Sequence, residues 1–147
     1  MINLLYAALG TLGFGMVFKT DKNKWLYIFI GGFLNYLAYF LVYSYTSDVF
    51  LSSMVCALVT STYSLFMAII LKCPSTIFIL TGLIPIVPGK NLFYTMQGLV
   101  TSNYAFAREN LILTVLVILG IVSGMAMFTV IHTISREVIS AIKRRVK

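Results

Sequence analysis

The sequence predicts an all-α integral membrane protein with about five transmembrane helices, the fourth of them broken at Pro85–Gly89. First, the 147 residues are 60% hydrophobic and only 10% charged, whereas soluble domains average roughly 45–50% and 25%. A soluble core of this size could not hide so much apolar surface. Second, the apolar segments are continuous and longer than the roughly 10-residue alternating strands of a membrane barrel. Third, two prolines interrupt one of these segments.

The first two predicted spans, 1–18 and 25–45, are joined by the lysine-rich stretch KTDKNK. The positive charges follow the first span instead of preceding it, which argues against a cleaved signal peptide. Asn35 lies within the second span and should face the bundle interior, because an unpaired amide is costly in hydrocarbon. Aromatic residues mark both ends of this span, as expected at membrane interfaces: Trp25, Tyr27, Tyr43 and Tyr45.

The third predicted span is 49–71, and the last is 110–134 after a turn at 102–110. Hydroxyl groups at 60–64 are expected to bond carbonyls of their own helix, which is a packing role. Gly120 and Gly124 form a GxxxG pattern in the last span. This pattern predicts close helix packing, either within the chain or against a partner.

The chain is expected to consist of a transmembrane domain, 1–134, and a basic amphipathic cytoplasmic tail, 135–147. With five spans and the N-terminus outside, every Lys and Arg except Lys90 and Arg108 lies on the cytoplasmic side. This asymmetry is typical of a multi-pass protein of the plasma membrane. The alternative, a re-entrant hairpin at 74–102, would place the basic tail outside.

The broken segment predicts two half-helices, 74–85 and 91–102, each roughly 18 Å long, so that the break falls near mid-membrane. Proline has no backbone N–H and disfavours helical geometry in the residue before it. Ile84 and Val87 are therefore expected to be extended, and Gly89 to adopt backbone angles that other residues avoid.

Backbone groups without partners must be buried or line a water-filled cavity. A half-helix N-terminus at mid-depth attracts anions, and the Lys90 ammonium adds a full charge there. The sequence therefore predicts a binding site for a small anionic or zwitterionic solute, although a simple packing kink is the alternative. The predicted site residues are Pro85, Pro88, Gly89, Lys90, Asn91, Tyr94 and Gln97.

Enzymatic activity, cofactors and metal sites are not expected. The chain has one histidine, four acidic residues near predicted helix ends and none of the usual catalytic motifs. The net charge of +7 comes from cations at segment ends, which serve membrane orientation and do not indicate nucleic-acid binding.

Two stretches, GFGMVFK at 13–19 and IPIVPGKNLFYTM at 84–96, resemble the threonine/serine exporter family, and most closely its short membrane subunit from two-component versions. The resemblance covers nearly the whole chain. It implies export of threonine, serine or a dicarboxylate such as succinate, with a longer partner subunit that carries a cytoplasmic domain. It carries motif roles to Pro85, Pro88, Gly89, Tyr94 and Thr95, whereas Lys90 departs from the small or apolar residues of the family.

The sequence therefore favours a membrane transporter subunit that exports a small carboxylate-bearing metabolite. No internal repeat is visible, so the other half of the transporter would come from a second, larger subunit or from a second copy of the chain. The alternatives are a non-transporting assembly or stabilising subunit of a transporter complex, and a small channel.

Overall fold

The computed structural model describes the backbone of residues 2–145 and the side chains of residues 4–137. The described residues form helices and no strand, so the predicted all-α fold is confirmed. The elements in chain order are α1 (Ile2–Val17), η1 (Lys22–Lys24), α2 (Trp25–Thr46), α3 (Val49–Leu71), α4 (Thr76–Leu83), η2 (Ile84–Ile86), α5 (Gly89–Val100) and α6 (Tyr104–Arg145).

Three helical segments are long and apolar enough to cross a membrane: Lys22–Thr46, Val49–Leu71 and Tyr104–Glu137. The pair Thr76–Ile86 and Gly89–Val100 makes a fourth crossing if it is one bent span. The fifth predicted crossing depends on α1. Its 16 residues span about 24 Å, less than the ~30 Å hydrocarbon core, so the count of five stays a prediction.

Helix α3 is the centre of the bundle and packs against α2, α4 and α6. Its buried face consists of small side chains, which lets the neighbouring helices approach closely. The hydroxyls of this face other than that of Ser61 bond carbonyls four residues earlier. The expected packing role is therefore confirmed for Thr60 and Ser64 but not for Ser61. Its members are Ser52, Ser53, Cys56, Ala57, Thr60, Ser61 and Ser64.

Gly120 and Gly124 of α6 lie against α3 of the same chain. A Cβ at Gly120 would come within 2.6 Å of the Phe50 carbonyl oxygen, and one at Gly124 within 2.9 Å of the Ala57 Cβ. Contacts this short leave no room for any side chain. The close approach of α3 and α6 therefore requires glycine at both positions.

Asn35 joins three helices in the bundle interior. Its side chain is fully buried, donates to the Gly82 carbonyl of α4 and accepts a hydrogen bond from the Cys56 thiol of α3. The expectation that Asn35 faces the interior is confirmed. The bond to Gly82 fixes the end of α4 immediately before the broken segment.

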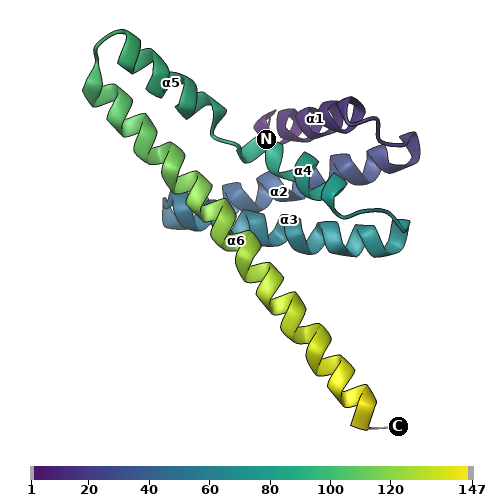
Figure 1. Cartoon of the computed structure of the whole chain (residues 1–147). Helices are drawn as coiled ribbons and strands as arrows, with labels where there is room; N and C mark the ends of the chain where they lie inside the picture. The colour runs from purple at the N-terminus through teal and green to yellow at the C-terminus, as the bar shows by residue number, and fades with distance from the viewer. Residues whose placement is uncertain (1, 146–147) are drawn as a thin grey trace.

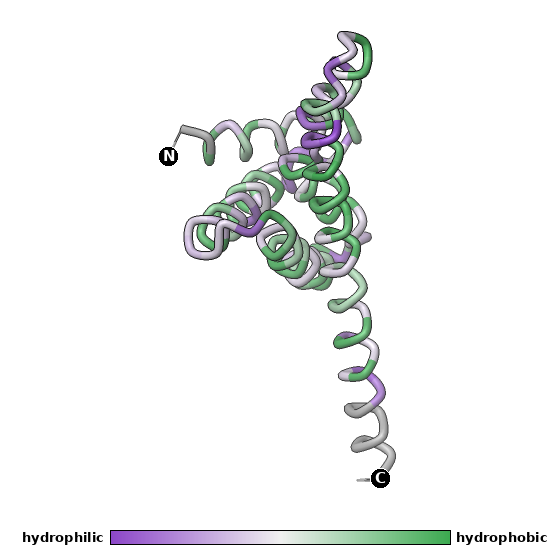
Figure 2. The backbone as a smooth tube through the Cα atoms, turned by 90° about the vertical axis from the view of Figure 1, so that its left-hand side faces the viewer, coloured by the Kyte–Doolittle hydropathy of each residue, from purple (hydrophilic) through white to green (hydrophobic). Residues whose placement is uncertain are grey.

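The last helix is longer than the sequence predicts. The predicted turn at 102–110 is wrong, because the chain turns only at 101–103 and α6 begins at Tyr104. The helix is then continuous to Arg145, across the boundary expected between the membrane domain and the tail. In Figure 2 the middle of α6 is coloured as hydrophobic and hydrophilic turns lie toward its ends. The predicted apolar face of the tail falls on 138–147, outside the described side chains.

Helices α1 to α4 form a bundle, and α5 forms a hairpin with the first part of α6 that extends away from it (Figure 1). Gly98 makes the hairpin tight, because a Cβ there would come within 2.8 Å of the Ala107 backbone nitrogen. The loops at 18–24 and 72–75 lie together at one end of the bundle. The lysines of both loops therefore belong to the same end of the bundle.

Candidate functional site

The broken segment changes direction without reversing. Helix α4 ends at Leu83, the single turn of η2 follows, and α5 starts at Gly89 with its axis 48° from the preceding part. A re-entrant hairpin requires the chain to double back, whereas a bend of this size keeps it moving toward the opposite end of the bundle (Figure 1). The geometry favours the broken crossing over the hairpin.

Only one of the two residues before the prolines is extended. Val87 has φ −53° and ψ 126°, as the sequence predicts. Ile84 has φ −50° and ψ −43°, so the expectation that it would be extended is wrong. The preference against helical geometry before proline is overcome here, because η2 makes a tight turn in which the Val87 N–H donates to the Ile84 carbonyl.

A three-residue turn around Pro88 completes the break. Pro88 has φ −78° and ψ 47°, near the inverse γ-turn, and the Gly89 N–H donates to the Val87 carbonyl at 2.8 Å. Gly89 has no positive φ, so the expectation that it adopts unusual backbone angles is wrong. A Cβ at Gly89 would meet nothing within 4 Å, so neither its angles nor its surroundings require glycine.

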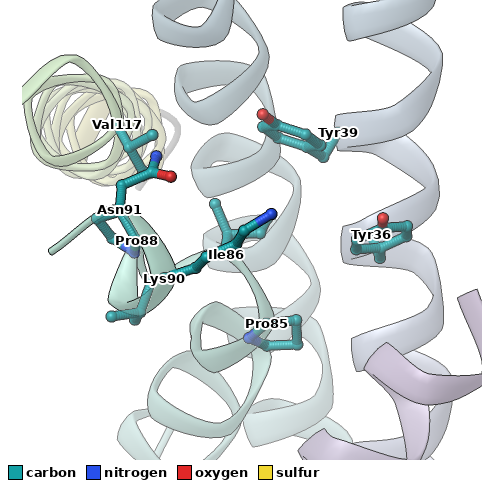
Figure 3. A pocket seen from close by; sticks show the side chains of 9 residues that line it. Tyr36, Tyr39, Pro85, Ile86, Pro88, Lys90, Asn91 and Val117 are labelled. Atoms are coloured by element: carbon teal, nitrogen blue, oxygen red, sulfur yellow. The ribbon is translucent and has the colours of Figure 1, made fainter. Parts of the chain in front are cut away.

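A hollow of about 170 Å³ opens between the break and α2. We call it the break pocket. It exceeds the ~15 Å³ that one water molecule needs, so it can admit a solute of several heavy atoms. In Figure 3 Lys90 extends from the start of α5 toward α2, where Tyr36 and Tyr39 stand on the opposite wall. The lining residues are Tyr36, Tyr39, Pro85, Ile86, Val87, Pro88, Lys90, Asn91 and Val117.

Several polar groups of the break pocket lack hydrogen-bond partners among the described residues. The first-turn amides of Lys90 and Asn91 have no acceptor, and Pro88 provides no side-chain cap. The Asn91 amide and the hydroxyls of Tyr36 and Tyr39 form no hydrogen bond with any described residue. The pocket thus presents several donors and one ammonium group to whatever occupies it, an arrangement suited to a carboxylate.

The structure brings four of the seven predicted site residues into the break pocket, namely Pro85, Pro88, Lys90 and Asn91. Gly89 lines a separate hollow. Tyr94 lies outside the pocket lining, where its ring is 5.5 Å from the Lys90 ammonium and packs on Phe106. Gln97 is exposed and also lies outside. Six helical residues turn a side chain by about 240°, which takes Gln97 off the face of Asn91.

Tyr36 and Tyr39 are pocket residues that the sequence analysis missed. They lie three residues apart on one face of α2, with ring centroids 6.4 Å apart. The available signal was their position directly after Asn35, which was already expected to face the interior. Polar-tipped aromatic residues on that face, away from the interfacial belts, could have been assigned to the same interior.

The opposite side of the break is apolar. A hollow of about 270 Å³ lies between α5 and α6 and is lined by Val87, Pro88, Gly89, Leu92, Thr114, Ile118, Ile121 and Val122. The break thus separates an apolar side from the polar break pocket. Among the described residues no group of three or more His, Cys, Asp or Glu side chains could hold a metal ion.

A helix broken beside a pocket of polar groups is an arrangement found in multi-span membrane transporters. The comparison with family models agrees, because residues 3–131 match the model described as "Threonine/Serine exporter, ThrE". The chain belongs to this family of membrane exporters, as the resemblance of its two motifs indicates. No curated protein and no solved structure is significantly similar to it.

Proposed function

We propose that this chain is one subunit of an exporter for a small carboxylate-bearing metabolite, either threonine or serine or a dicarboxylate such as succinate, and that the break pocket binds the carboxylate. The observation that carries the proposal is the unpaired N-terminal turn of α5, with Lys90 directed across the pocket toward Tyr36 and Tyr39 (Figure 3).

The physical reason lies in the cost of unpaired polar groups in the bilayer, which is several kcal/mol for each group. Two backbone amides and an ammonium group at one place favour a negatively charged partner. A carboxylate supplies two acceptor oxygens and a compensating charge. The tyrosine hydroxyls and the Asn91 amide add groups for the remaining polar atoms of the solute.

A partner chain would complete the site. Lys90 is exposed in the single chain, and α5 packs mainly on α6, so one side of the break pocket is open. Transporter sites of this kind lie between two related halves. We propose that the second half is a larger membrane subunit of the same family or a second copy of this chain.

We also propose that the protein resides in the plasma membrane with its N-terminus outside and its C-terminus in the cytoplasm. The loops that carry Lys19, Lys22, Lys24 and Lys72 lie at one end of the bundle (Figure 1). This arrangement supports the proposal, because cytoplasmic loops carry an excess of positive charge.

The test is efflux from liposomes that contain the full chain with any subunit that copurifies with it, loaded with labelled threonine, serine or succinate. The variant Lys90→Gln keeps a polar side chain but loses the charge. A hydrogen bond to a charged group contributes about 1.5–3 kcal/mol. We therefore expect the KM for the transported solute to rise roughly 10- to 100-fold.

The matched control is Lys22→Gln, which removes the same charge from an exposed loop and should leave KM unchanged. If Lys90→Gln keeps the wild-type KM and efflux still requires the chain, carboxylate binding at the break is refuted. That result would favour the assembly-subunit alternative. Failure to release any of the three solutes faster than protein-free liposomes would refute the proposed class of cargo.

A further inference from the structure

A second hollow lies at the other end of α4, at the helix N-terminus. Its volume is about 260 Å³, and it is enclosed by side chains of α3 and α6 and by the start of α4. We call it the α4 N-terminal pocket. Its lining residues are Ser61, Leu65, Ser75, Ile79, Met125, Phe128, Thr129 and His132.

The backbone at this end of α4 has free donors. The Phe78 and Ile79 amides both donate to the Ser75 carbonyl, at 3.1 and 3.0 Å, whereas the amides of Thr76 and Ile77 have no backbone acceptor among the described residues. Ser75 stands at the N-cap position but its hydroxyl caps nothing. The helix dipole adds partial positive charge at the same place.

A buried hydroxyl provides the independent observation. Ser61 is only 2% exposed and lines the pocket, yet it forms no hydrogen bond with any described residue. Ser64, one turn later on the same helix, is also buried, and its hydroxyl donates to the Thr60 carbonyl. Ser61 differs from Ser64 because it leaves its donor available to the pocket.

His132 closes the pocket from α6. Its ring stacks on Phe128 with centroids 5.9 Å apart and planes at 13°, which restricts the orientation of the imidazole. Like Ser61, it forms no hydrogen bond with any described residue. The pocket therefore combines two hydroxyls without partners and an imidazole, and the free amides of Thr76 and Ile77 directly follow Ser75, which lines it.

We infer that the α4 N-terminal pocket is a second binding station for the carboxylate of the transported solute. The ligand group would be an anionic oxygen, held by backbone amides at a helix N-terminus and by two hydroxyls. The 8 residues of α4 span about 12 Å. One short helix would thus have a carboxylate station at each end, with the break pocket at the far one. This inference rests on the proposed function.

The position of the pocket indicates which side of the membrane it serves. Ser75 is the last residue of the loop that carries Lys72, and this loop lies at the same end of the bundle as the first lysine-rich loop (Figure 1). A solute arriving from that side would reach the α4 N-terminal pocket before the break pocket. Loss of the station should therefore weaken binding from this side only.

The test measures KM separately from each side, in right-side-out and inside-out membrane vesicles that contain the full chain with any subunit that copurifies with it. Ser61→Ala and Ser75→Ala each remove one donor. We expect about a tenfold rise in KM for each when solute is offered at the face of the lysine-rich loops. KM from the opposite face should stay within about twofold of wild type. Ser64→Ala is the matched control, because it removes a neighbouring buried hydroxyl that does not line the pocket.

The outcomes separate this inference from the proposed function. If Lys90→Gln raises KM but Ser61→Ala and Ser75→Ala behave as Ser64→Ala does on both faces, the second station is refuted and the break pocket stands. If none of the four variants changes KM, both ideas fail.

A phospholipid headgroup could supply the same anionic oxygens, so the measurement is repeated in phosphatidylcholine liposomes with and without phosphatidylglycerol. An effect seen only with the anionic lipid would overturn the assignment to the solute.

Discussion

Replacing Gly124 by alanine tests whether the glycine pair of α6 packs within this chain. The added Cβ would lie 2.9 Å from the Ala57 Cβ, and closer still to the Met54 carbonyl oxygen. Ordinary carbon contacts are about 3.5–4.0 Å, so α3 and α6 would have to separate by about 1 Å. Overpacking of this kind costs about 1–3 kcal/mol, against a gain of at most about 1 kcal/mol in helix propensity.

The control is Gly13→Ala in α1, where a Cβ meets nothing within 4 Å. That variant gains helix propensity without a clash, so it should be neutral or slightly stabilising. Thermal unfolding of the purified chain in detergent should therefore give an apparent Tm roughly 2–10 °C lower for Gly124→Ala than for wild type. Gly120→Ala should behave similarly, because its Cβ would come within 2.8 Å of the Ser53 Cβ.

The contrary result is informative. If Gly124→Ala matches Gly13→Ala in the isolated chain but loses its partner or its oligomeric state, the glycine pair packs between chains. The reasoning from the contact of α6 with α3 would then be wrong. Equal stability with an intact assembly would show that the helices separate at no measurable cost, which would also contradict it.

Two further predictions concern the bundle interior next to the break. Asn35→Ala should lower the free energy of unfolding by about 1–3 kcal/mol in the same assay, because it leaves the buried Gly82 carbonyl without its donor; the control Thr62→Ala, at an exposed hydroxyl, should change it by less than about 0.5 kcal/mol. An effect of Asn35→Ala no larger than that of Thr62→Ala would show that the bond to Gly82 carries no stability. Maleimide should label native protein at partly exposed Cys73 and spare buried Cys56 until the chain is denatured, as mass spectrometry would report. Full labelling of Cys56 in the native protein would contradict its buried position on α3, where it faces Asn35 of α2.

The position of the break could be predicted from sequence because its cause is local. Proline lacks an N–H wherever it occurs, so Pro85 and Pro88 had to interrupt the helix. The backbone conformation within the break was harder to predict, since the tendency of a residue before proline to be extended is only a preference. Val87 follows it, whereas Ile84 stays helical because the tight turn of η2 supplies a hydrogen bond.

The composition of the break pocket depends on packing between distant segments, and there the sequence was less informative. Tyr36 and Tyr39 reach the pocket only because α2 lies beside the break, and that placement follows in part from the bond between Asn35 and Gly82. Periodicity along α5 alone assigned Gln97 to the site, although it turns away. Asn35 could be assigned correctly because burial of an amide is a local energetic demand that holds for any packing partner.

Under the proposed function, the charge of Lys90 links the fold to the transport cycle. An ammonium group at membrane depth needs a compensating anion or access to water. The described side chains include all four acidic residues, Asp21, Asp48, Glu109 and Glu137, and none lines the break pocket. The chain therefore leaves the countercharge at the break to an outside group. A solute carboxylate that supplies it would be bound more tightly than a neutral analogue of the same shape.

We expect the amide of the transported metabolite to compete poorly for wild-type protein, and Lys90→Gln to abolish most of that discrimination between acid and amide. Equal competition by acid and amide in wild type would show that the Lys90 charge is neutralised by another group, and the carboxylate assignment would fail.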